Sequence, residues 1–128
     1  MAATSDRLQH QIAAKAAKCV EDILSEKKDP AAYKSFCEGF PTLLRNAGLL
    51  QTLLFLEAKR DHPHGTLLNQ LKQHFTALGL AKENANLATT VANLGTAEYM
   101  AWTRMADKIA YWHKRFAQAL LSKDKLPS

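Results

Sequence analysis

The sequence predicts an all-α fold, a compact single-domain bundle of about six helices. Of its 128 residues 47% are hydrophobic, which is enough for one core, and the chain is too short for two ordinary domains. It contains only 5 Gly and 4 Pro, whereas the helix-favouring residues Ala, Leu, Lys and Gln are frequent. We expect residues 5–121 to form the folded core and residues 122–128 to be a flexible tail.

The first predicted helix runs from about Ser5 to Glu26. Its apolar residues recur at steps of four, four, three and four, which places them on one helical face: Leu8, Ile12, Ala16, Cys19 and Ile23. The opposite flank is polar and mostly basic, with Arg7, Gln11, Lys15 and Lys18. Such a helix packs on a core with one face and meets solvent with the other.

Helix-breaking residues separate the segments that follow. The pair Asp29–Pro30 is typical of an N-cap and a first helical position, so we expect a second helix there until Gly39 and Pro41 interrupt it. A third segment begins at Pro41 and ends in the turn-forming residues 46–48. The run 49–56 then has six apolar positions in eight, and we expect it to form a central helix.

The loop His62–Gly65 separates this run from two more predicted helices. Thr66 is expected to cap a helix that ends at Gly79 and has one apolar face: Leu67, Leu71, Phe75 and Leu78. A short helix follows, closed by Gly95, and its apolar residues also share one face: Leu87, Val91 and Leu94. Both segments show the helical period of elements that are buried on one side.

The final helix, capped by Thr96, is the most informative segment because it has two different faces. Its large apolar residues recur at steps of three and four, and we expect them to be buried as one stripe: Trp102, Met105, Ile109, Trp112 and Phe116. To one side of that stripe, within an arc of about 60°, lies a basic row with one aromatic member: Arg104, Lys108, Tyr111 and Arg115. Such a row suits a phosphate backbone, although a solvated helix flank is the commoner explanation.

The positive charge of the chain is concentrated in this final helix. Overall, 17 Lys and Arg against 12 Asp and Glu give a net charge of +5 and a pI of about 9.3. From Tyr99 onward, the sequence has six basic residues and only two acidic ones, Asp107 and Asp124. A charge of this size can orient a subunit on nucleic acid, but we expect tight binding only when several copies act together, because affinity grows with each phosphate neutralised.

Cysteine spacing and hydropathy point to the reducing interior of a cell. Cys19 and Cys37 do not form a Cys-x-x-Cys pair, so neither a structural zinc site nor a disulfide scaffold is indicated. We expect both to be free buried thiols. No apolar run has the length of a signal-peptide core or a membrane span, so we expect a cytoplasmic protein with no membrane partner.

No group of residues indicates a catalytic or metal site, and we expect no cofactor. His62 and His64 flank Pro63, but without a neighbouring cysteine or carboxylate cluster they are typical of an exposed turn. The other histidines lie on different predicted helices with no shared spacing and are expected at the surface: His10, His74 and His113. A Gly-rich phosphate loop, a nucleophile elbow and a zinc-protease motif are all absent from the sequence, which argues against an enzyme.

Two segments, Phe40–Asp61 and Ile109–Leu121, carry a specific combination of motifs. The first has a Pro-led helix, a polar residue before Gly-Leu and an apolar run with an early Gln: Pro41, Asn46, Gly48 with Leu49, and Gln51. The second has a Trp-x-x-Arg-Phe-Ala stretch: Trp112, Arg115, Phe116 and Ala117. In this order the motifs resemble the small-subunit family of the type III-B CRISPR effector, the Cmr complex.

The resemblance implies a non-catalytic subunit of an antiviral, RNA-guided complex. Several copies would stack head to tail as an inner filament beside the crRNA-bearing backbone subunits, with target RNA in the channel between the two filaments. RNA cleavage and nucleotide-signal synthesis belong to other subunits of such complexes. The implied partners are therefore the other effector subunits, further copies of the chain itself, crRNA and target RNA.

In this context the basic residues become candidates for contacts with the RNA backbone: Arg7, Lys15, Lys18, Arg45, Lys59, Arg104, Lys108, Lys114 and Arg115. Of these, Arg45 and Lys59 are equally candidates for contacts between subunits. Two other functions stay open, a helical adaptor that binds only protein and the small subunit of a related type III-A or type I effector. An RNA-processing enzyme would need an acid–base pair that the sequence does not reveal.

Overall fold

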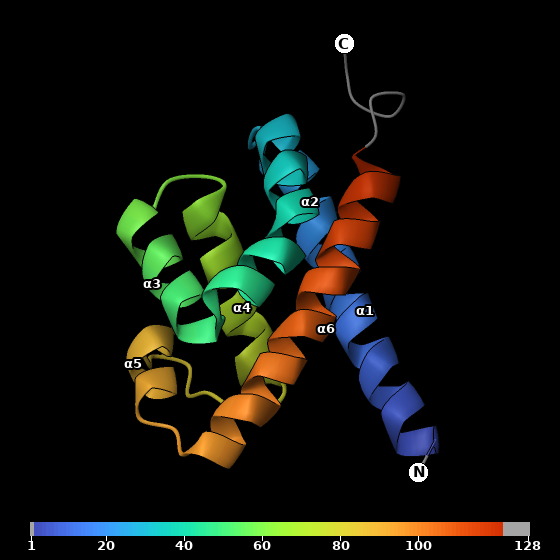
Figure 1. The fold of residues 1–128 in the computed structure, drawn as a ribbon. Coiled ribbons are helices and arrows are strands. Elements are labelled where there is room, and N and C mark those ends of the chain that lie inside the picture. Colours follow the sequence, from blue (N-terminus) through green and yellow to red (C-terminus); the bar gives the residue numbers. More distant parts are fainter. Residues whose placement is uncertain (1, 122–128) are drawn as a thin grey trace.

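Six helices and no strands make up the described part of the chain, which confirms the predicted all-α bundle. The computed structural model describes the backbone of residues 2–121 and the side chains of residues 7–121. In order, the helices are α1 (Ala2–Ser25), α2 (Pro30–Ala47), α3 (Leu49–Lys59), α4 (His64–Ala77), α5 (Leu87–Ala92) and α6 (Thr96–Leu120) (Figure 1). The predicted tail 122–128 lies outside the described residues.

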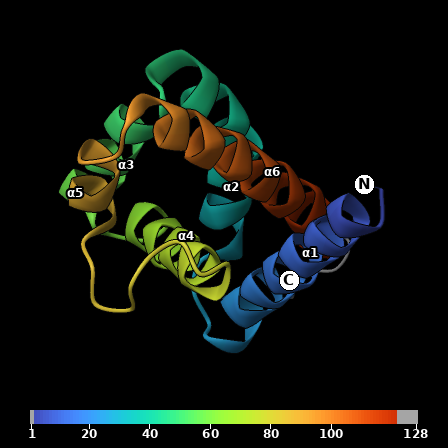
Figure 2. The same ribbon diagram turned by 90° about the horizontal axis from the view of Figure 1, so that it is seen from below.

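The final helix organises the bundle. The two most extensive helix contacts are those of α6 with α1 and of α6 with α2. The other three helices, α3, α4 and α5, form the rest of the bundle, and α3 contacts both α4 and α5 (Figures 1 and 2). As a result, α6 lies between the two longest remaining helices and has one face left for solvent.

Two apolar clusters form the interior. The larger one, here the main core, draws residues from all six helices, among them Ile12, Phe40, Leu53, Phe75, Val91 and Ile109. The smaller one, here the small core, comes from α1, α2 and the end of α6: Val20, Ile23, Tyr33, Cys37, Ala117 and Leu121. Both cysteines are buried free thiols, as predicted.

Pro41 does not break α2, so the predicted interruption at Gly39 and the separate segment starting at Pro41 are wrong. The helix begins as expected, with Asp29 Oδ1 accepting hydrogen bonds from the first-turn amides, and then runs unbroken to Ala47. Its buried residues recur at steps of four, three and four on both sides of the proline: Tyr33, Cys37, Phe40 and Leu44. Burying two large side chains beyond residue 39, at about 1.5–3 kcal/mol each, outweighs a proline cost of about 3 kcal/mol.

A single residue, Gly48, joins α2 to α3, at the predicted turn. Its φ of 84° and ψ of 165° lie in a region that is almost exclusive to glycine. Its N–H donates to the Leu44 carbonyl, 2.9 Å away, and closes α2. On the other side, the Leu50 N–H at the start of α3 donates to the hydroxyl of Tyr99, at 3.1 Å. The first turn of α6 thus caps the third helix.

Three helix ends differ from prediction. Helix α4 starts at His64 rather than after a Thr66 cap, and Thr66 is buried inside it. The Thr66 Oγ1 lies 2.9 Å from His62 Nδ1, and His62 Nε2 lies 2.8 Å from the Asp29 carbonyl. His62 therefore links the loop to the start of α2, instead of lying exposed in a turn as predicted. Helix α5 ends at Ala92, before Leu94, and the N-cap of α6 is Gly95 rather than Thr96.

Candidate nucleic-acid interface and a buried polar cluster

The basic row of α6 faces solvent. Arg104, Tyr111 and Arg115 are exposed, and Lys108 is partly exposed. The residues that α6 buries lie on the opposite side of the helix: Trp102, Ala106, Ile109, Ala110, His113 and Ala117. The row therefore points directly away from the core, and among residues 7–121 none of its three cations forms an ion pair.

The predicted apolar stripe is only partly buried. Trp102 and Ile109 are in the main core as expected, whereas Met105, Trp112 and Phe116 are only partly buried against the edges of the two cores, and Trp112 bonds to Gln9 of α1. Small residues take the buried positions because α6 packs against two helices at once, and alanine side chains let the backbones approach closely. The helix is therefore rotated about its axis relative to the prediction.

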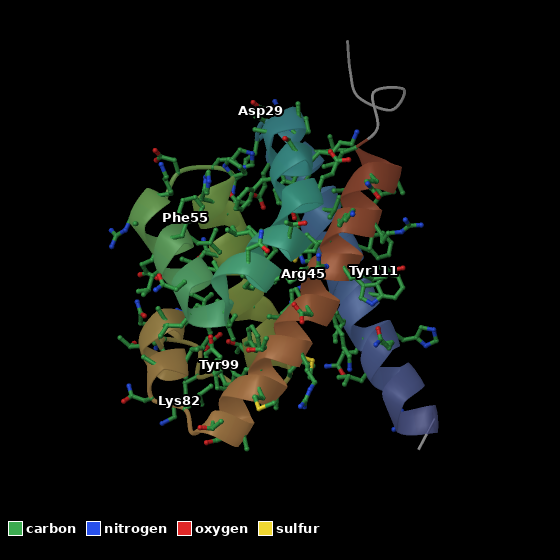
Figure 3. All side chains as sticks on the ribbon, viewed as in Figure 1. Asp29, Arg45, Phe55, Lys82, Tyr99 and Tyr111 are labelled. Atoms are coloured by element: carbon green, nitrogen blue, oxygen red, sulfur yellow. The ribbon has the colours of Figure 1, made fainter. Side chains whose placement is uncertain are left out.

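A groove between α2 and α6 brings two of the predicted basic residues together. It has a volume of about 600 Å³ and is lined by Pro41, Leu44, Arg45, Gly48, Thr103, Asp107, Tyr111 and Lys114. Arg45 and Tyr111 lie on adjacent helices on this side of the bundle (Figure 3). Burial raises the pKa of the Asp107 carboxyl, and the nearby Arg45 guanidinium opposes that rise. The groove combines two cations with an exposed aromatic ring and one acidic group.

The basic residues of α1 do not join this groove. Arg7 and Lys18 are exposed on α1, and Lys18 pairs with Asp22 at 3.7 Å. Lys15 lies on the flank of α1 that faces α4, where it lines a pocket of about 450 Å³ together with Lys72. The sequence offered no sign of this pair, because only packing places α4 beside α1.

Lys59, the last predicted basic residue, is isolated from the others. It ends α3, is exposed, and its Nζ lies 5.9 Å from the ring centre of Phe55. The nine predicted residues therefore occupy several surfaces rather than one. Among residues 2–121, no helix is both long and apolar enough to cross a bilayer.

Beneath these surfaces lies a polar cluster that the sequence reading missed. His74 and His113, predicted at the surface with no joint site, are each only 1% exposed, and their Nε2 atoms are 2.9 Å apart. Cys19 joins them from α1, so that one potential ligand atom from each residue lies within 4.8 Å of the others. On α6, His113 lies between Ala110 of the main core and Ala117 of the small core.

Hydrogen bonds fix the proton positions in this cluster. The Tyr33 hydroxyl donates to Gln70 Oε1 at 2.6 Å, and Gln70 Nε2 donates to the Cys19 carbonyl at 3.2 Å. Since Tyr33 has only one proton, His113 Nδ1, 3.0 Å from its oxygen, must be the donor there. His113 Nε2 is then an acceptor, so His74 Nε2 donates to it. Burial lowers the pKa of both imidazoles, which keeps them neutral at pH 7.

Known proteins match this fold over most of its length. Residues 8–120 match the model of a family described as CRISPR-associated protein (Cas_Cmr5). The CRISPR system Cmr subunit Cmr5 of Thermus thermophilus is 35% identical over 89 residues, which are 70% of this chain and 75% of that protein. The crystal structure of a CRISPR-associated Cmr5 family protein from the same organism superposes with a TM-score of 0.75 at 31% identity, covering 90% of this chain and 97% of that one.

Proposed function

The chain belongs to the Cmr5 family of the type III-B CRISPR system, and on that premise we propose that it is a non-catalytic small subunit that helps to hold target RNA in the Cmr complex. Several copies stack beside the crRNA-bearing filament and line the channel through which the target runs. The other subunits of the complex are its partners. Because guide pairing reads the sequence, this subunit needs only to position the RNA backbone.

The observation that carries this proposal is the outward basic row of α6. Arg104, Lys108 and Arg115 project from one helix face with no acidic partner among residues 7–121. Tyr111, 50% exposed, lies among them and offers a ring on which a base can stack. Guanidinium, ammonium and phenol groups of this kind hold phosphates and bases, whereas hydrolysis needs an activated nucleophile that the row does not supply.

The groove between α2 and α6 extends the same surface. Arg45 and Lys114 approach it from different helices, so an RNA strand that follows the row can also meet these two cations. Phosphate contacts of this kind add affinity without sequence preference. We expect the remaining predicted basic residues to contribute less to RNA binding, because Lys15 is turned toward α4 and Lys18 is already paired with Asp22.

A different surface suits contact with a neighbouring protein subunit. An apolar groove of about 530 Å³ lies between α2, α3 and the start of α4, lined by Ala32, Ser35, Phe36, Gly39, Leu43, Phe55, Pro63 and His64. Phe55 and the adjacent Leu54 are 39% and 48% exposed. We propose that this groove meets the next copy in the stack, while the basic row stays open to RNA.

The test is a triple variant, Arg104→Ala, Lys108→Ala and Arg115→Ala, assembled with the other Cmr subunits and titrated with target RNA across salt concentrations. Each lost phosphate contact lowers the salt dependence by about 0.7 for a single strand, so we expect the slope to fall by up to about two units. The control removes the same charge elsewhere, through Lys28→Ala, Lys34→Ala and Lys82→Ala, and should leave the slope unchanged.

Three results would count against the proposal. If the triple variant incorporates normally and binds target RNA with an unchanged slope and affinity, the row faces solvent or protein, and the RNA contact moves to Arg7, Lys15 and Lys18. If RNA retention by the complex does not depend on this subunit at all, the chain is a protein-binding adaptor. Metal-dependent RNA cleavage by the purified chain would contradict a non-catalytic role.

A further inference from the structure

The buried cluster of Cys19, His74 and His113 has the composition of a metal site. A thiolate and two imidazoles are the ligands that zinc and similar transition metal ions prefer in proteins. The three side chains come from α1, α4 and α6, are 4%, 1% and 1% exposed, and place their potential ligand atoms within 4.8 Å of one another. We propose that Cys19 Sγ, His74 Nε2 and His113 Nε2 bind one zinc-class divalent ion, which links these three helices.

The separation of the two ring nitrogens is close to what such an ion requires. Two nitrogen ligands at 2.0–2.1 Å from a tetrahedral Zn²⁺ are about 3.3 Å apart. His74 Nε2 and His113 Nε2 are already 2.9 Å apart, so the rings need to separate by only a few tenths of an ångström. The rings meet edge to face, with centroids 5.0 Å apart, so the two imidazoles approach each other without stacking.

The groups around the cluster orient its ligands. Metal-binding histidines almost always donate their second ring N–H to another polar group, which fixes the tautomer. His113 Nδ1 donates to Tyr33, and Tyr33 is held in turn by Gln70. In this tautomer Nε2 carries a lone pair, so His113 can bind a metal ion through Nε2 without changing its tautomer.

A polar pocket reaches one of the three proposed ligands, Cys19. The pocket, about 170 Å³, is lined by Cys19 and by polar side chains that include Asp22, Glu26, Lys28 and Gln70. Each of the two carboxylates is paired with a lysine, Asp22 with Lys18 and Glu26 with Lys28, so the pocket is polar without a large net charge. Three protein ligands leave a fourth coordination position, which a water molecule from this pocket can fill.

Metal binding changes protons but transfers no electrons. Burial raises the pKa of the Cys19 thiol to about 11, so the metal-free thiol is protonated at neutral pH. On binding, the S–H bond breaks, a metal–sulfur bond forms and the proton leaves to solvent. The proton that His74 Nε2 shares with His113 moves to His74 Nδ1, which frees the second nitrogen lone pair. Affinity should therefore rise with pH.

The experiment uses the full chain, stripped of metal with a chelator and titrated with Co²⁺. We expect one equivalent to bind and to produce the thiolate-to-cobalt charge-transfer band in the near ultraviolet, and Zn²⁺ to displace it. Cys19→Ala should abolish the band, while Cys37→Ala, which removes the other buried thiol, should keep it. Tyr33→Phe should lower the affinity by about 10- to 100-fold through loss of the orienting hydrogen bond.

Three outcomes would overturn the site. Wild-type protein that shows no cobalt band contains only a histidine pair joined by a hydrogen bond. A band that survives in Cys19→Ala, or that disappears equally in Cys37→Ala, places the metal elsewhere. Because the absence of a band from the wild-type protein overturns the site without any variant, the proposal stays testable even if a variant fails to fold, and the test is independent of RNA binding.

Discussion

Trp112 donates a hydrogen bond from its indole Nε1 to Oε1 of Gln9, 2.9 Å away and 103 positions earlier in the chain. The bond joins the flank of α6 to α1, where the Trp112 side chain is partly buried and packs on the edge of the main core. Trp102, on the same helix, is 5% exposed and stacks on Phe75 with ring centres 4.8 Å apart. The two tryptophans thus have different roles, one at the edge and one in the core.

Replacing each tryptophan by alanine should separate these roles. Trp102→Ala should lower the free energy of unfolding by about 3–5 kcal/mol, because it leaves a large cavity in the main core. Trp112→Ala should cost less, about 1–3 kcal/mol, because its side chain is only partly buried. Denaturant unfolding followed by circular dichroism gives both values, and an equal or larger loss at Trp112 would contradict the observed burial.

Gly48→Ala should destabilise the protein by about 1–3 kcal/mol through backbone strain alone. A Cβ at this position would meet only the Tyr99 hydroxyl, at 3.6 Å, which is an ordinary contact. The matched control is Gly39→Ala, inside α2, where nothing lies within 4 Å of the new Cβ. That change should stabilise by about 0.5–1 kcal/mol, because alanine favours the helix. If the melting temperatures of both variants shift in the same direction, backbone strain at Gly48 is ruled out.

The metal-free protein should lose stability in mild acid. Burial holds the pKa of His74 and His113 below that of an unfolded histidine, about 6.5, and Lys15 lowers that of His74 further. Protons therefore bind the unfolded state more tightly. Stability should be constant above pH 6.5 and fall below it, by up to about 1.4 kcal/mol per pH unit for each histidine.

Urea midpoints measured between pH 7.5 and pH 5 in the presence of a chelator check this dependence. His10→Gln, which changes an exposed histidine, is the control and should leave the pH profile unaltered. His74→Gln should flatten it, since one of the two buried titrating groups is gone. A wild-type profile that is level down to pH 5 would mean that the imidazoles are accessible to protons in the folded state.

Asp107→Asn should strengthen RNA retention by the assembled complex. The carboxylate lies in the α2–α6 groove with Arg45 and Lys114, where its negative charge opposes a phosphate. Removing one exposed charge is worth up to about 1 kcal/mol, or about two- to fivefold in affinity. Filter binding at fixed salt measures the change, with Asp61→Asn, remote from the groove, as the control. Weaker retention would show that Asp107 serves to orient Arg45 rather than to repel RNA.

The parts of the fold that depend on nearby residues followed from the sequence. Apolar steps of three and four marked the helices, and Asp29 and Gly48 marked a start and a turn, because each acts on a backbone within a few positions of itself. The family motifs then indicated the complex to which the chain belongs. These signals need no knowledge of which helices meet.

The features that the sequence could not predict all depend on packing between distant segments. Pro41 is tolerated because the helix on both sides of it is buried against the core. The rotation of α6 about its axis relative to the prediction follows from its packing against both α1 and α2. This packing favours small residues such as Ala106 and Ala110 over large ones at the buried positions. His74 and His113 are 39 residues apart and share no helical spacing, so only the tertiary fold brings them to one point.

The buried polar cluster also sets how the helices align along their lengths. A slip of α6 by one turn, about 5.4 Å, would carry His113 out of reach of both Tyr33 and His74 and leave their polar atoms without it. Each polar group left without a partner would lower the free energy of unfolding by about 1–3 kcal/mol. A purely aliphatic contact between the helices would tolerate the slip far better. The α6 surface that carries the basic row is thereby held at one height relative to α1, α2 and α4.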